Sequence, residues 1–138
     1  MIKTSFLNIS SEGFTDIRDI TPDLSRILNE SQMENGTMTV FVPGSTGGVT
    51  TIEYEPGLVK DIREVLEKIA PVKADYHHHN TWHDDNGSAH VRAALMGPSL
   101  TIPFVNKELT LGTWQQVVFI DFDTRSRSRR LVVQIMGE

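Results

Sequence analysis

The stretch "LTLGTWQQVVFIDFDTRSRSRRLVVQIMG", residues 109–137, decides the fold class, because it holds two apolar runs on either side of a short polar segment. Both runs are rich in β-branched and aromatic residues, which are typical of strands. The segment between them, residues 124–128, has the polar composition of a turn. The end of the chain therefore predicts antiparallel strands joined as a hairpin.

Further strands are predicted along the rest of the chain. Residues 98–105, "PSLTIPFV", form one, and the "NKE" turn at residues 106–108 leads from it into the C-terminal runs. The loosely alternating residues 2–10 and 13–20 predict two opening strands, and the β-branched residues 37–43 predict a buried one.

Helices are predicted in three places. Residues 21–32 begin with Thr21 as a candidate cap and Pro22 at the first helical position. Residues 57–70 carry apolar side chains at helical spacing, and residues 89–97 are long enough for two more helical turns. The order of elements predicts an α+β fold, with a largely antiparallel β-sheet core packed against two to three helices.

Composition limits the classes of function. A chain of 138 residues is most simply one domain, residues 1–138, and is long enough to bury a core. The net charge of −5 argues against nucleic-acid binding, which needs a basic surface. No apolar run is long enough for a membrane helix, the N-terminus lacks a signal-peptide pattern, and cysteine is absent. We therefore expect a cytoplasmic protein without disulfides or thiolate metal sites.

All five histidines lie in residues 75–90, "DYHHHNTWHDDNGSAH". Neutral imidazole is the commonest protein ligand of zinc and related metals, and carboxylates complete such sites. His78 and His90 can converge if the chain folds back at the "DDNG" turn. His83, Asp84 and Asp85 lie between them and would then add a ligand or orient a ring. The alternative is a polar surface loop, since neighbouring residues of an extended chain point to opposite sides.

The "GSTGG" turn, residues 44–48, is a candidate anion site, because it offers freely oriented amides and the hydroxyls of Ser45 and Thr46. It lacks the lysine of a P-loop. The strand that follows ends near Glu53 and Glu55, which are candidates for a general base or metal ligand. The alternative for both is a solvated charge at a strand edge.

Arginines cluster before the last strand. Arg125, Arg127 and Arg129 would share one face of an extended chain, and arginine binds phosphate bidentately. Solvated turn charges are the preferred interpretation for Arg125 and Arg127, whereas Arg129 and Arg130 adjoin the strand and are better placed for a fixed role. The Trp-Gln pair at residues 114–115 fits a core or interface position for the tryptophan, or stacking on a heteroaromatic ligand.

Several motifs together resemble one family. The run "H-x-x-x-W-x-D-D-N-G-x-A-H" from His78 to His90 is followed by "LMGPSLTIPF", "LTLGTWQQVVFIDFD" and the closing "RRLVVQIMGE". In this order they resemble the YjbQ-type family, whose members are described as secondary thiamine-phosphate synthases. The resemblance covers nearly the whole chain and is most specific from Tyr76 to Glu138.

The resemblance implies a compact α+β fold, assembly as a homotrimer, and a histidine-lined pocket that holds a divalent metal ion, zinc or magnesium. It implies a metal-assisted enzyme acting on phosphorylated heterocycles, which makes thiamine phosphate from a phosphorylated pyrimidine and thiazole phosphate. The alternatives are a non-catalytic trimer that binds a metal or a phosphorylated ligand, and a metal-dependent phosphoester hydrolase.

Site residues can be carried over onto this sequence. His78 and His90 would be metal ligands, with Asp85 as a third ligand, a ring-orienting group or a catalytic carboxylate. Glu53 would be the acid/base candidate, and Tyr76 and Trp114 also match the family's pattern. The candidate phosphate-binding residues are Ser45, Thr46, Gln115, Arg129 and Arg130.

One position departs from the family's pattern. Gly44 stands where many members carry a histidine, in a "His-Thr-Thr/Ser-Ala" turn. Either His77, His79 or His83 takes its place in space, or the chemistry of this chain differs. The departure bears on the activity more than on the fold.

Overall fold

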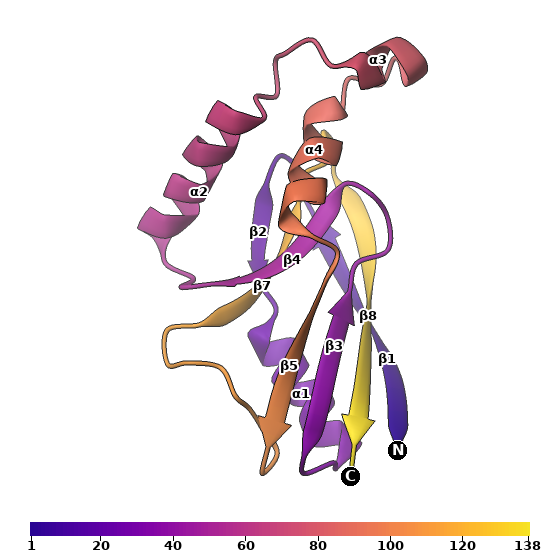
Figure 1. The fold of residues 1–138 in the computed structure, drawn as a ribbon, viewed down its shortest axis with the longest axis vertical. Helices are drawn as coiled ribbons and strands as arrows, with labels where there is room; N and C mark the ends of the chain where they lie inside the picture. The colour runs from indigo at the N-terminus through magenta and orange to yellow at the C-terminus, as the bar shows by residue number, and fades with distance from the viewer.

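A computed structural model describes all of residues 1–138 as eight strands and four helices (Figure 1). The strands are β1 (Ile2–Ser11), β2 (Asp16–Asp19), β3 (Gly36–Phe41), β4 (Gly47–Ile52), β5 (Ser99–Val105), β6 (Glu108–Leu109), β7 (Gln116–Asp121) and β8 (Arg127–Gly137). The helices are α1 (Thr21–Ser31), α2 (Pro56–Ile69), α3 (His77–Trp82) and α4 (Gly87–Met96). None of these helices is long and apolar enough to cross a membrane.

The strands form two antiparallel sheets. The larger has the order β1-β8-β3-β5-β6 and the smaller the order β2-β7-β4. The predicted α+β class with an antiparallel core is thus confirmed. The number of helices is four rather than two or three, because the histidine segment itself forms α3.

Strand β7 is apolar at consecutive positions because both of its faces are buried. Val117 and Phe119 face the larger hydrophobic cluster, between the two sheets and α1. Val118 and Ile120 face the opposite way, into a second cluster with Leu66 of α2 and the alanines of α4. A strand buried on both faces has no solvent side, so its sequence does not alternate.

The predicted C-terminal hairpin is wrong in its pairing. Strand β7 pairs with β2 and β4, whereas β8 pairs with β1 and β3, so the turn between them carries the chain from one sheet to the other. The preceding turn is a hairpin as predicted, with Val105 opposite Glu108. Asn106 and Lys107 have φ of 52° and 67° there, the left-handed conformation that a two-residue hairpin requires.

Two details at the helix starts differ from expectation. Thr21 is the first residue of α1 rather than its cap; its amide donates to Asp19 Oδ1 at 3.0 Å, and its hydroxyl accepts from the Val117 amide at 2.8 Å.

Glu55 is not a free charge, because its carboxylate caps α2 by accepting from the amides of Gly57 and Leu58. Glu55 therefore has a structural role.

The ends of the molecule differ in character. The two termini lie side by side, with the Met1 amino group donating to the Gly137 carbonyl at 3.0 Å. Figure 1 shows α2, α3 and α4 gathered at the opposite end. The histidine segment and the Gly-rich turn before β4 thus lie together, remote from the termini.

Candidate functional site: a histidine pair beside a buried ion network

The chain folds back between α3 and α4, as convergence of the histidines requires. His83 and Asp85 have φ of 57° and 53°, so the chain turns sharply after α3. At Gly87 a Cβ would lie 2.5 Å from the Cβ of Tyr76, and the Tyr76 hydroxyl donates to the Pro71 carbonyl. The close approach that glycine allows sets the start of α4 against the start of α3.

The structure brings His78 and His90 together. Their ring centroids are 4.3 Å apart, with the planes inclined by 35°. The Nδ1 atom of His78 lies 3.4 Å from Oδ1 of Asp84, yet it is buried without a hydrogen-bond partner. Two imidazoles and one carboxylate therefore gather at this point, although no three histidine, aspartate or glutamate side chains converge on a common centre.

The environment keeps His90 neutral. Burial, and then the neighbouring His78, lower the pKa of His90, while Asp84, Asp123 and the backbone of Ser45 oppose that shift with less effect. A histidine with a lowered pKa carries no proton on one ring nitrogen at neutral pH. That is the form of imidazole that binds a metal ion or accepts a proton.

Arg129 forms a buried ion pair next to this site. Its guanidinium donates to both carboxylate oxygens of Asp121 at 2.8 Å, and to the Thr46 hydroxyl at 2.7 Å. Burial alone would raise the pKa of Asp121, but hydrogen bonds from Arg129 and from the Asp123 amide lower it overall. Most of the Arg129 donors are thus used inside the protein.

Asp123 extends this ion pair toward Asn86, at the start of α4. It accepts from the Thr46 hydroxyl at 3.2 Å and from Arg127 Nη1 at 2.7 Å. The Asn86 amide nitrogen lies 3.5 Å from Asp123 Oδ1; with the amide turned over, the nitrogen lies 3.0 and 3.2 Å from the oxygens of Asp84 instead, so it donates to one carboxylate at a time. The Gly-rich turn, the end of β7 and the start of α4 are therefore linked by polar side chains.

Asp85 does not join His78 and His90. Its side chain is 77 % exposed, and its amide donates to Nδ1 of His79 at 3.1 Å in a neighbouring pocket that His77 also lines. The acidic neighbour of the histidine pair is Asp84 instead. His79 packs edge-on against His83, with ring centroids 5.7 Å apart.

The space beside Gly44 is open, with an arginine at its edge. A Cβ at Gly44 would have one neighbour within 4 Å, Nη1 of Arg129 at 3.5 Å. None of His77, His79 and His83 reaches that position. The turn keeps Thr46 buried in the ion network and leaves Ser45 exposed, near His90 in a cavity of about 240 Å³.

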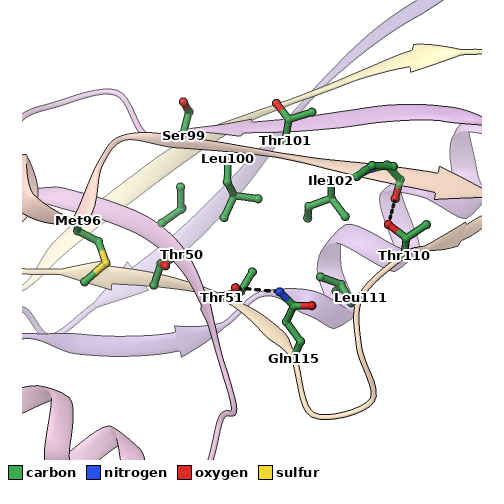
Figure 2. A pocket seen from close by; sticks show the side chains of 12 residues that line it. Thr50, Thr51, Met96, Ser99, Leu100, Thr101, Ile102, Thr110, Leu111 and Gln115 are labelled. Carbon is green, nitrogen blue, oxygen red and sulfur yellow. Dashed lines mark hydrogen bonds between the residues drawn. The ribbon is translucent and has the colours of Figure 1, made fainter.

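Four other candidate residues, Glu53, Gln115, Arg130 and Trp114, lie away from the histidines. Glu53 and Gln115 lie near the far end of β4, where Ile52 pairs with Gln116, whereas Gly47 at its start pairs with Asp121. Six residues of strand span about 20 Å. Figure 2 shows Gln115 donating to the Thr51 hydroxyl, at 3.0 Å, on the wall of a separate pocket of about 410 Å³.

Arg130 and Trp114 face elsewhere too. Arg130 points to the other side of β8 from Arg129, where its guanidinium lies 3.8 Å above the ring of Phe6. Trp114 is 74 % exposed, so it is no part of the core of this chain. Of the predicted residues outside the histidine pair, Asp85 lines the neighbouring pocket, Gln115 lines the distal pocket, and Glu53, Arg130 and Trp114 line neither.

Several residues in and around the histidine site are not predicted from the sequence. Asp121, Asp123 and Asn86 are not among the predicted candidates, and Asp84 is one of two aspartates between which the sequence does not decide. The available signal was "DFD" at the end of the apolar run, because two aspartates two positions apart point the same way into a region with arginines.

Comparison of the sequence with known proteins identifies its family. Residues 5–138 match the family described as UPF0047 protein YjbQ-like. A UPF0047 protein of Methanothermobacter thermautotrophicus is 36 % identical over 137 residues, covering 99 % of this chain and 94 % of that protein. One from Archaeoglobus fulgidus is 34 % identical over 130 residues, covering 94 % and 98 %.

Solved structures agree as well. A YbjQ-like protein of unknown function from Sulfolobus solfataricus has a TM-score of 0.89 at 29 % identity, with 100 % of both chains covered. A YjbQ/UPF0047 family protein from Clostridium acetobutylicum has a TM-score of 0.87 at 34 % identity, covering 96 % of this chain and 99 % of that one. The chain belongs to the YjbQ-like UPF0047 family, and the resemblance inferred from its sequence is confirmed.

Proposed function

We propose that this protein is a metal-assisted enzyme acting on phosphorylated heterocycles, with thiamine-phosphate synthesis as its activity. One observation carries the proposal: His78 and His90 face each other beside Asp84, and Nδ1 of His78 is buried and unpaired. Leaving a buried polar atom without a partner costs about 1–3 kcal/mol, so such an atom points to a ligand that binds there.

His78, His90 and Asp84 would hold the metal ion. Imidazole ligands suit zinc, whereas magnesium takes oxygen ligands and keeps several waters, so we propose zinc. The Asp84 side chain is 46 % exposed and would turn toward the rings to complete the set. Three protein ligands leave a position for substrate, where the bound ion would neutralise charge on phosphate oxygens.

The proposed reaction makes one bond and breaks one. The ring nitrogen of thiazole phosphate attacks the methylene carbon of the pyrimidine, and the carbon–oxygen bond to pyrophosphate breaks with its electron pair leaving on the pyrophosphate. That nitrogen carries no proton, so the attack needs no general base. The site therefore does not need Glu53 or Asp85 as a base. Its role would be to hold the anionic substrates and to stabilise the leaving pyrophosphate.

A metal-dependent phosphoester hydrolase is the second candidate, because a metal ion held by His78, His90 and Asp84 could activate a water molecule for attack on phosphorus. The remaining alternative is a trimer that binds the same ligands without catalysis.

We further propose that the protein is a homotrimer of the cytoplasm. Apolar side chains one turn apart are exposed on α2, at Val65 and Ile69, and on α4, at Val91 and Leu95. Trp114 is exposed too. Exposed apolar patches mark interaction surfaces, and the absence of cysteine suits a reducing compartment.

Metal analysis joined to two activity assays tests the proposal. Tag-free protein should hold about one zinc ion per chain, and thiamine-phosphate synthesis should stop on chelation and resume when zinc is returned. Phosphoester hydrolysis with the same metal dependence, without synthesis, would favour the hydrolase. Bound metal with neither activity would leave the binding trimer, and synthesis that is indifferent to chelation would contradict the metal-assisted mechanism.

Changing His90→Ala should remove the bound zinc, because a single imidazole and one carboxylate hold the ion weakly. The matched control is His77→Ala, since His77 lies in the same segment but lines the neighbouring pocket. Mass spectrometry of the metal content should show loss in the first variant and wild-type content in the second. Equal zinc in both would remove His90 from the metal site.

A further inference from the structure

We propose that Arg125 and Arg127 form an anion subsite beside the histidine pair and bind a phosphate group of the ligand. The inference deepens the proposed function, on which the identity of that phosphate rests. A cavity of about 380 Å³ is lined by Asp84, the carboxylate 3.4 Å from His78, and its lining contains no apolar residue. The lining residues are Asp84, Asn86, Asp123, Thr124, Arg125 and Arg127.

Arg125 is the arginine without a partner. Every other arginine has a hydrogen bond, an ion pair or an aromatic ring against its guanidinium, whereas the side chain of Arg125 has none. All of its N–H groups are thus open to a ligand. Guanidinium binds phosphate through two parallel hydrogen bonds, which makes a free arginine in a polar cavity a suitable anchor.

Arg127 supplies the second cation. Its Nη1 donates to Asp123 Oδ2 at 2.7 Å, which fixes the side chain, and the side chain is still 36 % exposed. The guanidinium keeps further N–H groups on Nε and Nη2. A side chain already held in place loses little conformational freedom when an anion binds.

The arginines expected from the sequence are less suitable. Arg129 is 6 % exposed, and its guanidinium donates to Asp121 and Thr46. Arg130 lies over Phe6 on the other face of β8. Neither lines the cavity. The two residues that the sequence left as turn charges are therefore the ones the structure presents to it.

The backbone of this subsite is held by a strained segment. Gly13, Phe14 and Thr15 have φ of 75°, 53° and 64°, and left-handed conformations at the two non-glycine residues cost about 1–2 kcal/mol each. The Phe14 amide donates to the Asp123 carbonyl at 2.7 Å, and a Cβ at Gly13 would collide with the Arg125 carbonyl. Strain of this kind persists where the surroundings fix it, often beside ligand sites.

The charges of the lining residues explain how a metal ion at the histidines would assist anion binding in the cavity. Asp84 and Asp123 balance the two arginines, and Asp123 also lies 3.9 Å from the buried Arg129. Without a metal the cavity has little net charge to attract phosphate. A divalent ion at the histidines would add two positive charges, so zinc should strengthen phosphate binding.

Calorimetric titration with inorganic phosphate tests the subsite, in chelator-treated and in zinc-loaded protein. We expect Arg125→Gln to weaken phosphate binding about tenfold or more, because it removes charge-assisted hydrogen bonds. Arg127→Gln should weaken it as well, and Arg127→Lys should restore part of the affinity by restoring charge. The control is Arg130→Gln, which changes an exposed arginine outside the cavity.

The outcomes separate the subsite from the metal. Arginine-dependent phosphate binding in protein that takes up no zinc would keep the subsite and contradict the proposed metal function. Phosphate binding that Arg125→Gln leaves unchanged, in both states, would overturn the subsite even if zinc binds as proposed. Wild-type protein that binds no phosphate in either state would overturn it too.

Discussion

Asp121 and Arg129 are charged side chains that the fold buries together. Asp121 is fully buried and Arg129 nearly so, yet hydrogen bonds hold the pKa of Asp121 below its usual 3.8 and that of Arg129 above its usual range. Removing one partner of such a pair leaves an uncompensated buried charge, which is far more costly than losing an exposed pair. The pair therefore fixes the ends of β7 and β8 and, through Thr46, the Gly-rich turn.

We predict that Arg129→Met lowers the free energy of unfolding at neutral pH by about 3–5 kcal/mol, because Asp121 is then buried without a partner. In the wild type, the lowered pKa values of Asp121 and Asp123 add stability above the unfolded value near 3.8, and this is lost as the pH falls through the folded values. In the variant, burial should raise the pKa of Asp121, so stability should decline with rising pH instead.

Urea denaturation across a pH series measures both effects. Arg18→Met is the control, because Arg18 pairs with Asp16 at the surface and such pairs contribute about 0–1 kcal/mol. Equal losses in the two variants would contradict the structural role of the Arg129 pair.

At the level of elements, α3 and α4 bring the two histidines together by packing at one glycine. Gly87 touches Tyr76, and α3 is too short to be stable without such contacts. This arrangement was only partly predictable. The "DDNG" turn predicts that the chain folds back. It does not predict that Asp85 adopts a left-handed conformation, which turns its side chain outward.

We predict that Gly87→Ala displaces Tyr76 and α3, and lowers zinc affinity about tenfold or more through loss of ligand geometry. The control is Gly112→Ala, because a Cβ there meets nothing closer than 3.7 Å. Calorimetric zinc titrations should separate the two variants, with circular dichroism confirming that both are folded. Wild-type zinc affinity in Gly87→Ala would show that the α3–α4 contact does not position the ligands.

For the whole molecule, local composition predicted most elements but not their partners. The strands at 37–43 and 98–105 follow from β-branched and apolar runs, whereas the pairing of β8 with β1 joins residues more than a hundred positions apart. The same limit applies to the site. Glu53 and Gln115 resemble the family's functional residues, yet they lie just after β4 and just before β7, at the end of that strand pair away from the histidines.

The exposed apolar residues of α4 make the proposed trimer testable. We expect the wild type to have the mass of three chains in light scattering, and Leu95→Glu to yield monomers, because a charge buried at an interface costs several kcal/mol. Val105→Glu serves as control, since Val105 is similarly exposed but lies near the β5–β6 hairpin, away from α4. A wild-type monomer, or a trimer in Leu95→Glu, would contradict this interface.

The central claim is that His78 and His90 bind one metal ion. Crystals grown with zinc, measured at the zinc absorption edge, test it most directly. The account predicts an anomalous peak about 2.0–2.1 Å from a nitrogen of each ring, with Asp84 turned toward it. A peak at His79 and His83 instead would contradict it. So would the absence of a peak at His78 and His90 when the same protein binds zinc in solution.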